Sequence, residues 1–583
     1  MKRYLIIMML ALSVSGSATA QSYLDGCWFG GLLVERDRMT PMDIFSLTQT
    51  SHNFGTARSM AMAGAFTSLG ADMSSMSLNP AGLGMYRHSE LSLTPMMTFE
   101  RSSNSAESNM SNHANRFSVG NIGVVFKAYE GTGRVLAVNI GLGYNRTADY
   151  NSNYSFKSLH RYNTFANVLE RQLNYSAEDI GVNSNGLISN AFGFRDFDIS
   201  SEFWGGVLGY KSRLLNYYDS EFFRGWGLDE YPYSYSDSDL PFYTDQYTSV
   251  RSRGSAGEYA FSVAMNVNNK FYIGATLGIF RMNRKESVIY GENIFATDDA
   301  VVTLDPEEYT LQYFDYMQYR QMRGSGVNFK IGMVWRPTNA LRLGFAFHTP
   351  TYYSVNFNYS AGMKSMSESR YYDSKEQEVY KNSYENWYTP EIKDNGPDTW
   401  EFTSPARMMF GASYAFGTLA VLSVDYERDW YNGIRMKNMP SVLAHCKGDY
   451  NDYFRTAFKG SNTVRVGVEV KPAPRVALRA GYGFNSSMLR ENATSEWSDA
   501  LYTTPVVRRI DYWSVGAGFA LSQRVSLDVA YQHVAGKSSS YSTFYAYAYD
   551  DNFRIDEGAS QYSQRYTTKL TSHNVALTMN VKF

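Results

Sequence analysis

The last ten residues of the chain read Asn574-Val575-Ala576-Leu577-Thr578-Met579-Asn580-Val581-Lys582-Phe583, and they alternate between two faces. One face carries Val575, Leu577, Met579, Val581 and Phe583, and the other carries Asn574, Thr578, Asn580 and Lys582. Side chains of a β-strand point alternately to opposite sides, so this segment has one apolar and one polar face. Such alternation over about ten residues is typical of a strand with lipid on one side and a wet lumen on the other.

The same alternation recurs upstream. Val464, Val466, Val468 and Val470 lie opposite Thr463, Arg465, Glu469 and Lys471, and Val525, Leu527, Val529 and Tyr531 lie opposite Arg524, Ser526, Asp528 and Gln532. A soluble β-sandwich would show a similar pattern, so alternation alone leaves two architectures open.

The lengths of the connections favour a membrane barrel over a sandwich. Fourteen segments have strand character: 89–101, 115–128, 134–148, 257–267, 271–286, 324–336, 340–350, 405–415, 418–430, 461–471, 475–486, 509–521, 524–536 and 570–583. Short turns, such as 130–133 and 268–270, alternate with long polar stretches. Bacterial barrels have short periplasmic turns and long external loops, whereas a sandwich has no reason to sort its loops in this way. The sequence therefore predicts an all-β fold, a transmembrane antiparallel β-barrel of about fourteen strands from 89 to 583, with long, partly helical external loops, the longest at 149–256.

The beginning of the chain predicts export to the cell outer membrane. Met1-Lys2-Arg3, an apolar run from Tyr4 to Val14 and the small residues Ala18-Thr19-Ala20 form the pattern of a signal peptide over residues 1–20, so the mature chain is expected to start near Gln21. No later apolar run approaches the roughly 20 residues that a spanning helix needs. The aromatic final residue, Phe583, is typical of substrates of the barrel-assembly machinery, which is an expected partner during biogenesis.

Composition and motifs argue against several classes of function. The net charge of −2 gives no indication of nucleic-acid binding, for which surfaces are usually strongly basic. The chain contains no Gly-x-Ser-x-Gly, no His-Glu-x-x-His and no phosphate-binding glycine loop, so neither an enzyme nor a cofactor is expected. Its two cysteines, Cys27 and Cys446, allow at most one disulfide, and no paired-ligand spacing predicts a metal site.

Residues 21–88 precede the first strand and do not alternate like one. A segment of this size on the periplasmic side must hang below the barrel or fill it, and an unfilled lumen of fourteen strands would leak polar solutes. Small residues are frequent from Gly55 to Asp72, which would let the backbone pack closely inside a lumen, and Asn79-Pro80 predicts a turn. We therefore expect an N-terminal extension and a lumen plug.

The stretch from Gly55 to Asp72, followed by Leu78-Asn79-Pro80-Ala81-Gly82-Leu83, resembles the plug of the FadL/TodX family of outer-membrane transporters for hydrophobic compounds. The segments 326–350, 405–407 and 424–430 are also similar to that family. The resemblance implies a fourteen-stranded monomeric barrel in which the ligand binds first at external loops, the plug shifts, and the ligand leaves sideways through the wall. Two features depart from the family pattern: the extension at 21–53 and the length of the second external loop.

The resemblance also suggests site residues. Asn79, Pro80 and Ala81 would act in gating, with Gly64 and Gly82 as packing positions. The interruption of alternation at Gly120-Asn121 predicts a β-bulge near the plug, which could mark a lateral opening. Four inward-facing arginines are candidates to hold a ligand carboxylate: Arg342, Arg407, Arg465 and Arg479. Alternatively, they pair with inward carboxylates in a lumen network formed with Asp425, Glu427, Glu469 and Asp528.

The expected function is passive, plug-gated uptake of a small hydrophobic molecule, such as a long-chain fatty acid, which would leave the barrel into outer-membrane lipid. Two other functions stay open. A haem receptor would need an exposed histidine ligand, and His533 is expected on the lipid-facing side and His348 on the inward side. A docking platform for surface proteins would be compatible with the long loops.

Overall fold

The computed structural model describes residues 33, 38–49, 55–105, 112–161, 164–166, 168–169, 204–218, 222–225, 242–296, 302–304, 307–373, 376–388, 399–490, 507–538, 543–549, 555–562 and 566–583. The signal peptide predicted at 1–20 and Cys27 lie outside these residues.

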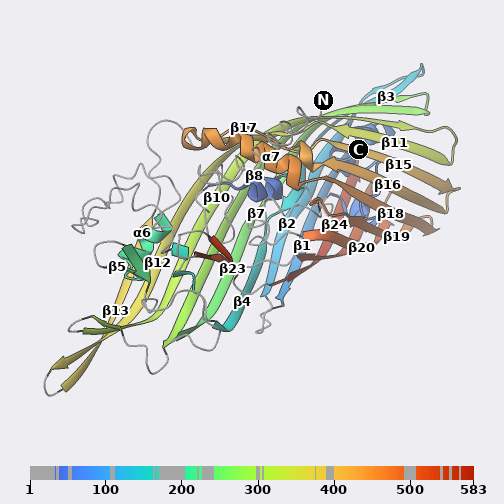
Figure 1. Ribbon diagram of the computed structural model, residues 1–583. Coiled ribbons are helices and arrows are strands. Elements are labelled where there is room, and N and C mark those ends of the chain that lie inside the picture. The colour runs from blue at the N-terminus through green and yellow to red at the C-terminus, as the bar shows by residue number, and fades with distance from the viewer. Residues whose placement is uncertain are drawn as a thin grey trace, which may run out of the picture.

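The wall is a closed antiparallel barrel of fourteen strands (Figure 1), as the sequence predicted. In order around the barrel, the strands are β1 (Glu90–Asn104), β2 (Asn112–Glu130), β3 (Val135–Asp149), β7 (Phe242–Val267), β8 (Phe271–Ala296), β10 (Glu307–Trp335), β11 (Leu341–His348), β15 (Arg407–Phe416), β16 (Ala420–Trp430), β18 (Gly460–Ala473), β19 (Val476–Asn485), β20 (Val507–Ala520), β21 (Val525–Ser538) and β24 (Thr568–Lys582). The first and last strands close the ring, with Leu91 of β1 opposite Val581 of β24.

The outer face of the wall is apolar, because alternate residues of each strand point outward. On β8, Phe271, Ile273 and Leu277 are exposed, while Tyr272 and Thr276 between them are buried against the lumen contents. A lipid-facing surface favours this division, since an apolar side chain meets hydrocarbon without a desolvation cost. Among the described residues, no helix is both long enough and apolar enough to span a bilayer.

The wall continues well beyond the apolar zone on the side of the long loops. Strands β7 and β8 have 26 residues each and β10 has 29. They are joined there by β4 (Ser152–Arg161), β9 (Val302–Leu304), β12 (Tyr352–Asp373), β13 (Glu376–Tyr388), β14 (Thr399–Thr403) and β17 (Arg435–Asn438). In Figure 1 this extension runs down to the β12–β13 hairpin at the lower left. Two further hairpins are formed by β5 (Leu215–Tyr218) with β6 (Phe222–Gly225) and by β22 (Tyr545–Tyr549) with β23 (Ile555–Tyr562).

The longest external loop is shorter than expected. The segment 149–256, predicted as one loop, contains β4 and the first fifteen residues of β7, and these two strands pair, with Ser152 opposite Ser252. Outside the bilayer, neither face of a strand must be apolar, so these strands lack the alternation by which membrane strands are recognised. The same segment also contains the helix α6 (Trp204–Lys211).

Chain from the N-terminal side fills the lumen. The plug, residues 55–89, contains α3 (Ala57–Ala61) and two 3-10 helices, η2 (Met73–Met76) and η3 (Pro80–Met85). Ahead of it, α2 (Pro41–Thr48) lies inside the barrel on the side of the long loops. The connection between β16 and β18 folds over α2 with η4 (Tyr431–Gly433), η5 (Ser441–Cys446) and α7 (Lys447–Ala457), and Figure 1 shows α7 crossing the barrel beside α2.

Local sequence explains why α2 forms. Thr40 accepts a hydrogen bond from the backbone N–H of Asp43, and the Asp43 carboxylate accepts one from the backbone N–H of Thr40, which is a reciprocal capping box. Pro41 stands at the first helical position, where its missing N–H costs nothing. A helix of eight residues is unstable alone, so α2 depends on its packing.

That packing is aromatic and closes the lumen on the loop side. The ring of Phe45 lies 5.2 Å from the ring of Tyr431 and 4.7 Å from that of Phe458, measured between centroids. The hydroxyl of Tyr450 on α7 donates to the carbonyl of Met39 at 2.7 Å. These residues belong to one large buried apolar cluster that continues through the extended part of the wall. Anything entering from outside meets α2 before it meets the plug.

A buried carboxyl in the external wall predicts pH-dependent stability. Glu292 on β8 accepts hydrogen bonds from the backbone N–H of Phe165 at 2.7 Å and from the hydroxyls of Thr164 and Tyr290. Burial raises the pKa of Glu292 to about 7, although these hydrogen bonds act in the opposite direction. The folded state therefore binds a proton more tightly than the unfolded state, in which the pKa of this carboxyl is near 4.5. This stabilisation is complete at a pH below the pKa of the unfolded state, and it is lost as the pH rises through about 7.

We expect the melting temperature of the detergent-solubilised protein to fall between pH 5 and pH 8, with Glu292 contributing about 3 kcal/mol to the difference. Glu292→Gln keeps an acceptor for Phe165 but does not titrate, so its pH profile should be flatter. A variant profile that parallels the wild type would contradict this assignment.

Candidate functional site: the plugged lumen

The plug touches the wall where the wall has glycine. A Cβ added to Gly274 on β8 would lie 2.5 Å from the carbonyl carbon of Pro80, and one added to Gly344 on β11 would lie 2.6 Å from that of Thr67. Such distances are too short for real atoms, so the plug backbone occupies the space that wall side chains would fill. Backbone or side-chain atoms of the plug also lie within 3.0 Å of the Cβ position at further inward glycines of the wall: Gly332, Gly411, Gly467, Gly481 and Gly516.

Asn79 ties the plug to the wall. Its side-chain oxygen accepts from the backbone N–H of Ala81 at 3.1 Å and so caps η3. Its side-chain amide donates to the carbonyl of Thr67 at 2.6 Å and to that of Met333 on β10 at 3.3 Å. Pro80 follows as the first residue of η3. One side chain thereby links two turns of the plug with a membrane strand.

The other predicted plug residues also lie inside the barrel. Ala81 is fully buried against Tyr272 of β8 and Val334 of β10. At Gly82, a Cβ would meet the Ser75 hydroxyl at 2.5 Å. Gly64 has φ of 75°, a left-handed conformation that glycine adopts without strain, and it lines the cavity described next. Their part in gating stays a prediction.

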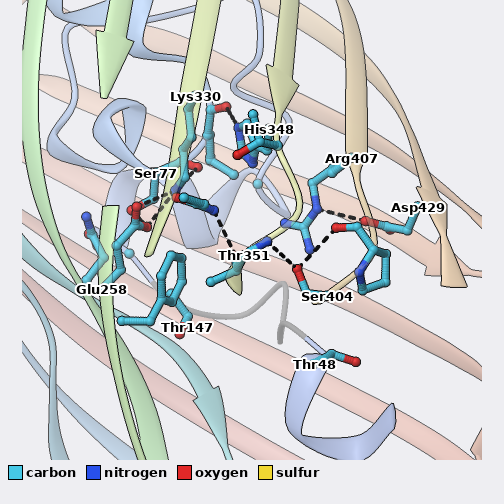
Figure 2. Close-up of a pocket in the computed structure, with 18 of the residues that line it drawn as sticks. Thr48, Ser77, Thr147, Glu258, Lys330, His348, Thr351, Ser404, Arg407 and Asp429 are labelled. Carbon is cyan, nitrogen blue, oxygen red and sulfur yellow. Dashed lines mark hydrogen bonds and ion pairs between the residues drawn. The ribbon is translucent and has the colours of Figure 1, made fainter. Parts of the chain in front are cut away.

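A cavity of about 90 Å³ lies between the plug and α2. Figure 2 shows Ser77 of the plug on one side with Lys330, His348 and Arg407 of the wall, and Thr48 of α2 on the opposite side. Three aromatic residues also line it: Phe280, Tyr353 and Tyr431. The cavity is therefore enclosed by both N-terminal elements and has polar and aromatic sides.

Polar groups at the cavity hold the plug. Lys330 on β10 forms an ion pair with Glu258 on β7 at 2.5 Å, and its ammonium donates to the carbonyl of Ser77 at 3.2 Å (Figure 2). The hydroxyl of Ser77 donates to Glu258 at 2.7 Å. The His348 Nε2 lies 2.8 Å from the carbonyl oxygen of Leu78. Movement of this part of the plug would break all three links.

Arg407 and Arg465 both line the cavity and both have carboxylate partners. The Nε of Arg407 lies 2.8 Å from Asp429 and 3.2 Å from Glu427. Arg465 pairs with the other oxygen of Glu427 at 2.5 Å. These two arginines therefore form an ion-pair network with the inward carboxylates, and a ligand carboxylate would have to join that network.

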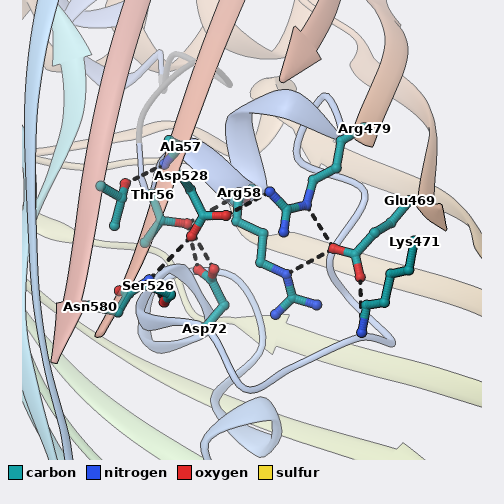
Figure 3. A network of polar contacts seen from close by, with 12 residues as sticks. Thr56, Ala57, Arg58, Asp72, Glu469, Lys471, Arg479, Ser526, Asp528 and Asn580 are labelled. Carbon is teal, nitrogen blue, oxygen red and sulfur yellow. Dashed lines mark hydrogen bonds and ion pairs between the residues drawn. The ribbon is translucent and has the colours of Figure 1, made fainter. Parts of the chain in front are cut away.

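Arg479 belongs to a second network at the end of the lumen with the short turns (Figure 3). Its guanidinium pairs with Glu469 and with Asp528, each at 2.7 Å. Arg58 of the plug reaches the same Glu469 at 3.2 Å. Buried charges need such partners, because desolvation of an unpaired ion is costly. The structure thus places Arg479 away from the cavity, where it fastens the plug.

Arg342 differs from the other three arginines. Its guanidinium lies 3.7 Å from the sulfur of Met85, and within the described part of the chain it forms no ion pair with a carboxylate. It stands on β11 close to the end with the short turns. The four predicted ligand contacts therefore do not form one site.

Plug and wall also meet at the seam where the barrel closes. The backbone N–H of Ala57 donates to the hydroxyl of Thr578 on β24 at 2.7 Å, and that hydroxyl lies 2.8 Å from the hydroxyl of Thr94 on β1. Beside it, the register of β1 and β2 shifts, with Thr94 opposite Asn121 and Pro95 opposite Val119. The β-bulge predicted at Gly120-Asn121 is confirmed. A Cβ on Gly120 would lie 3.2 Å from the carbonyl oxygen of Gly55.

A buried ion network fixes α2 above the cavity. Arg320 on β10 donates two hydrogen bonds to the carboxylate of Asp43, at 2.7 and 2.9 Å, and one to Glu286 on β8 at 2.9 Å. Arg284 also pairs with Glu286, at 2.6 Å, and donates to the hydroxyl of Ser46 at 2.6 Å. Two arginines and two carboxylates therefore join α2 to the wall.

Sequence reasoning missed Lys330, Glu258 and the whole of α2. Lys330 stands on the inward register of its strand, so alternation places it in the lumen, but only three-dimensional structure shows that Glu258 faces it. For α2, the legible signal is Thr40-Pro41-Met42-Asp43, a capping box with proline at the first position.

The sequence alone leaves open what the histidines and the cysteines do. His533 lies on the outer face, with its ring centroid 4.9 Å from that of His573, and His348 lies inside, as expected. No group of three potential metal ligands exists among the described residues. Cys446 is fully buried and disulfide-bonded, and the only other cysteine, Cys27, lies outside the described residues.

Comparison with solved structures finds matches of low sequence identity. The P. putida toluene transporter TodX is 9% identical, with a TM-score of 0.44, covering 91% of this chain and 99% of that chain. The Ralstonia pickettii toluene transporter TbuX is 12% identical, with a TM-score of 0.44 and coverage of 91% and 99%. A Pseudomonas aeruginosa FadL homologue is 13% identical, with a TM-score of 0.44 and coverage of 94% and 99%. No curated protein matches the chain.

A family model decides the classification. The model described as outer membrane protein transport protein (OMPP1/FadL/TodX) matches residues 231–583, which is more than half of the chain. The match covers the wall from β7 to β24 and includes the segments at 326–350, 405–407 and 424–430 that resemble the family. The chain belongs to the OMPP1/FadL/TodX family of outer-membrane channels for hydrophobic compounds.

Proposed function

We propose that the chain lets small hydrophobic molecules with a polar end, such as long-chain fatty acids, cross the outer membrane passively, and that the plug is the gate. The observation that carries this proposal is the position of the cavity, directly on the plug and enclosed by wall strands. A solute leaving it toward the periplasmic end must move the plug, because wall glycines bring the plug into contact with β8 and β11.

The lining of the cavity supports an amphipathic ligand. Phe280, Tyr353 and Tyr431 offer aromatic surface, and burial of each methylene of an alkyl chain there would stabilise binding by about 0.8 kcal/mol. Arg407 offers a guanidinium, which has five N–H donors and can serve a ligand carboxylate in addition to Asp429. The size of the cavity fits one end of such a ligand, so binding of a longer chain requires movement of α2 or of the plug.

Asn79 is the proposed latch of the gate. Its amide bonds to Thr67 and Met333 are lost if η3 moves away from β10, and the Ser77 and Leu78 contacts with Lys330 and His348 lie directly beside it. A ligand that draws Lys330 toward itself would weaken its contact with Ser77. Ligand binding and plug release would then be coupled.

The test is extraction and mass spectrometry of lipids that co-purify with the detergent-solubilised barrel, for the wild type and for Asn79→Ala/Pro80→Ala. We expect fatty acid or another apolar compound on the wild type, and a severalfold change in the retained amount in the variant, because the latch that closes the cavity is lost.

A matched control is Asn339→Ala/Pro337→Ala, which changes the same residue types in a short turn outside the lumen. Its retained lipid should equal that of the wild type. A wild-type barrel without any apolar ligand would refute transport of such molecules, whereas ligand retained equally by all three proteins would refute only the latch.

A further inference from the structure

Five cationic side chains gather on the outer face of the wall where β7, β8 and β10 adjoin. This outer basic patch consists of Arg251, Arg253, Arg281, Lys285 and Arg323. All five are exposed, and all stand on the outward register of their strands. Arg253 lies directly opposite Lys285, and Arg323 lies opposite Asn283, one outward position from both Arg281 and Lys285. The patch therefore concentrates positive charge on three neighbouring strands.

Among the described residues, no carboxylate pairs with a cation of the patch. Across the residues that the structure describes, none of the five cations forms an ion pair or a side-chain hydrogen bond. The nearby carboxylates of Glu258 and Glu286 point inward and are bound by Lys330 and by Arg284 and Arg320. Like charges directly opposite each other on adjacent strands destabilise a sheet. An anionic ligand from outside would remove this repulsion.

The height of the patch on the wall indicates what that ligand is. Outward residues of β8 are apolar from Phe271 to Ile279, and Arg281 is the next one. At about 3.3 Å per residue along a tilted strand, the apolar stretch covers most of the roughly 25 Å apolar band of a membrane barrel. The patch begins where the band ends, on the side away from the short turns. This is the level of the lipid headgroups in the outer leaflet.

An open groove of about 500 Å³ borders the patch. Three of the five patch residues, Arg251, Arg253 and Lys285, line it together with Tyr319 and Asn358. Glu286 also belongs to its lining, but this carboxylate is already paired with Arg284 and Arg320. Guanidinium groups bind phosphate oxygens through paired N–H donors, and lysine adds a mobile positive charge. We propose that the outer basic patch binds the phosphate groups of a phosphate-bearing lipid of the outer leaflet. This site is on the outside of the barrel and does not depend on the proposed passage through the lumen.

The test is native mass spectrometry of the full detergent-solubilised chain titrated with diphosphoryl lipid A. The variants are Arg253→Gln, Lys285→Gln and Arg323→Gln, singly and combined. We expect the triple variant to bind at least tenfold more weakly than the wild type and each single variant to lose part of the affinity, which preserves the test if the triple variant assembles poorly. The matched control is Arg509→Gln, an exposed arginine of β20 that already pairs with Asp511 at 2.8 Å, and its affinity should stay within twofold of the wild type.

Salt and competitor distinguish the source of the phosphate. Binding should weaken as sodium chloride is raised, because exposed charges are screened, and inorganic phosphate at the lipid concentration should not displace the lipid. Equal affinity of the wild type and all patch variants would overturn the proposal. Displacement by equimolar inorganic phosphate would also overturn it, since the patch would then be a site for free phosphate and not for a membrane lipid.

Discussion

Alanine at Gly274 and Gly344 is expected to unseat the plug. Each added methyl group would lie 2.3 to 2.5 Å from the nearest plug backbone atom, at Thr67 and at Pro80, and backbone cannot move aside as the end of a flexible side chain can. Overpacking of this kind costs about 1–3 kcal/mol per site. The two contacts are on different strands, so their costs should add. In the double variant the equilibrium constant for the seated plug should therefore fall by a factor of about 100 or more.

Hydrogen exchange of the detergent-solubilised protein measures this directly. Backbone amides of residues 59–70 should exchange at least tenfold faster in Gly274→Ala/Gly344→Ala, while the wall amides keep their protection. Gly133→Ala is the matched control, because a Cβ there meets nothing within 4 Å. Wild-type protection of the plug in a correctly closed double variant would show that the wall glycines do not hold it.

Asp43→Asn is expected to release α2. The substitution keeps the shape of the side chain but leaves the buried guanidinium of Arg320 with only Glu286, which Arg284 already shares. Removal of one partner of a buried ion pair costs about 3–5 kcal/mol. The capping box with Thr40 is weakened at the same time. Amides of residues 42–48 should therefore exchange on the order of 100-fold faster.

A second substitution separates the ion pair from the cap. In Asp43→Asn/Arg320→Met no guanidinium is left unpaired and Glu286 keeps Arg284, so part of the protection should return. Asp452→Asn on α7, where the pair with Arg455 is exposed, is the control and should change nothing measurable. If Asp43→Asn alone leaves the exchange of α2 unchanged, the ion network does not hold the helix.

The membrane-spanning part of the fold could be predicted from sequence because the bilayer imposes a rule on every strand. Outward positions such as Phe271 and Val575 must be apolar, so the strands, their number and their turns can be predicted from the sequence. Beyond the bilayer the rule ends. The upper part of β10 carries polar residues on both sides. In β12 the pattern is reversed, because Val355 and Phe357 are buried while Asn356 and Asn358 are exposed. Neither strand therefore has the apolar outward face by which a membrane strand is recognised.

The site was predictable in part for a similar reason. Alternation shows that Arg407, Arg465 and Glu427 point inward, and the plug motif draws attention to Asn79. Which charges meet depends on the stagger between strands, which sequence does not give. Arg479 faces the plug at the other end from the cavity for this reason, and Arg342 stands apart with Met85. The wall glycines were visible only as an unusual composition, since their purpose depends on what lies against them.

The contact at Thr578 links the closure of the barrel wall with the seating of the plug. Its hydroxyl bonds to Thr94 of the first strand and to the backbone of Ala57, so one atom joins β24, β1 and the plug. The bond to Thr94 exists only where β24 pairs with β1, and the bond to Ala57 exists only where the plug is seated. A barrel that closed around an empty lumen would therefore lack one of the two bonds that this hydroxyl makes at the seam.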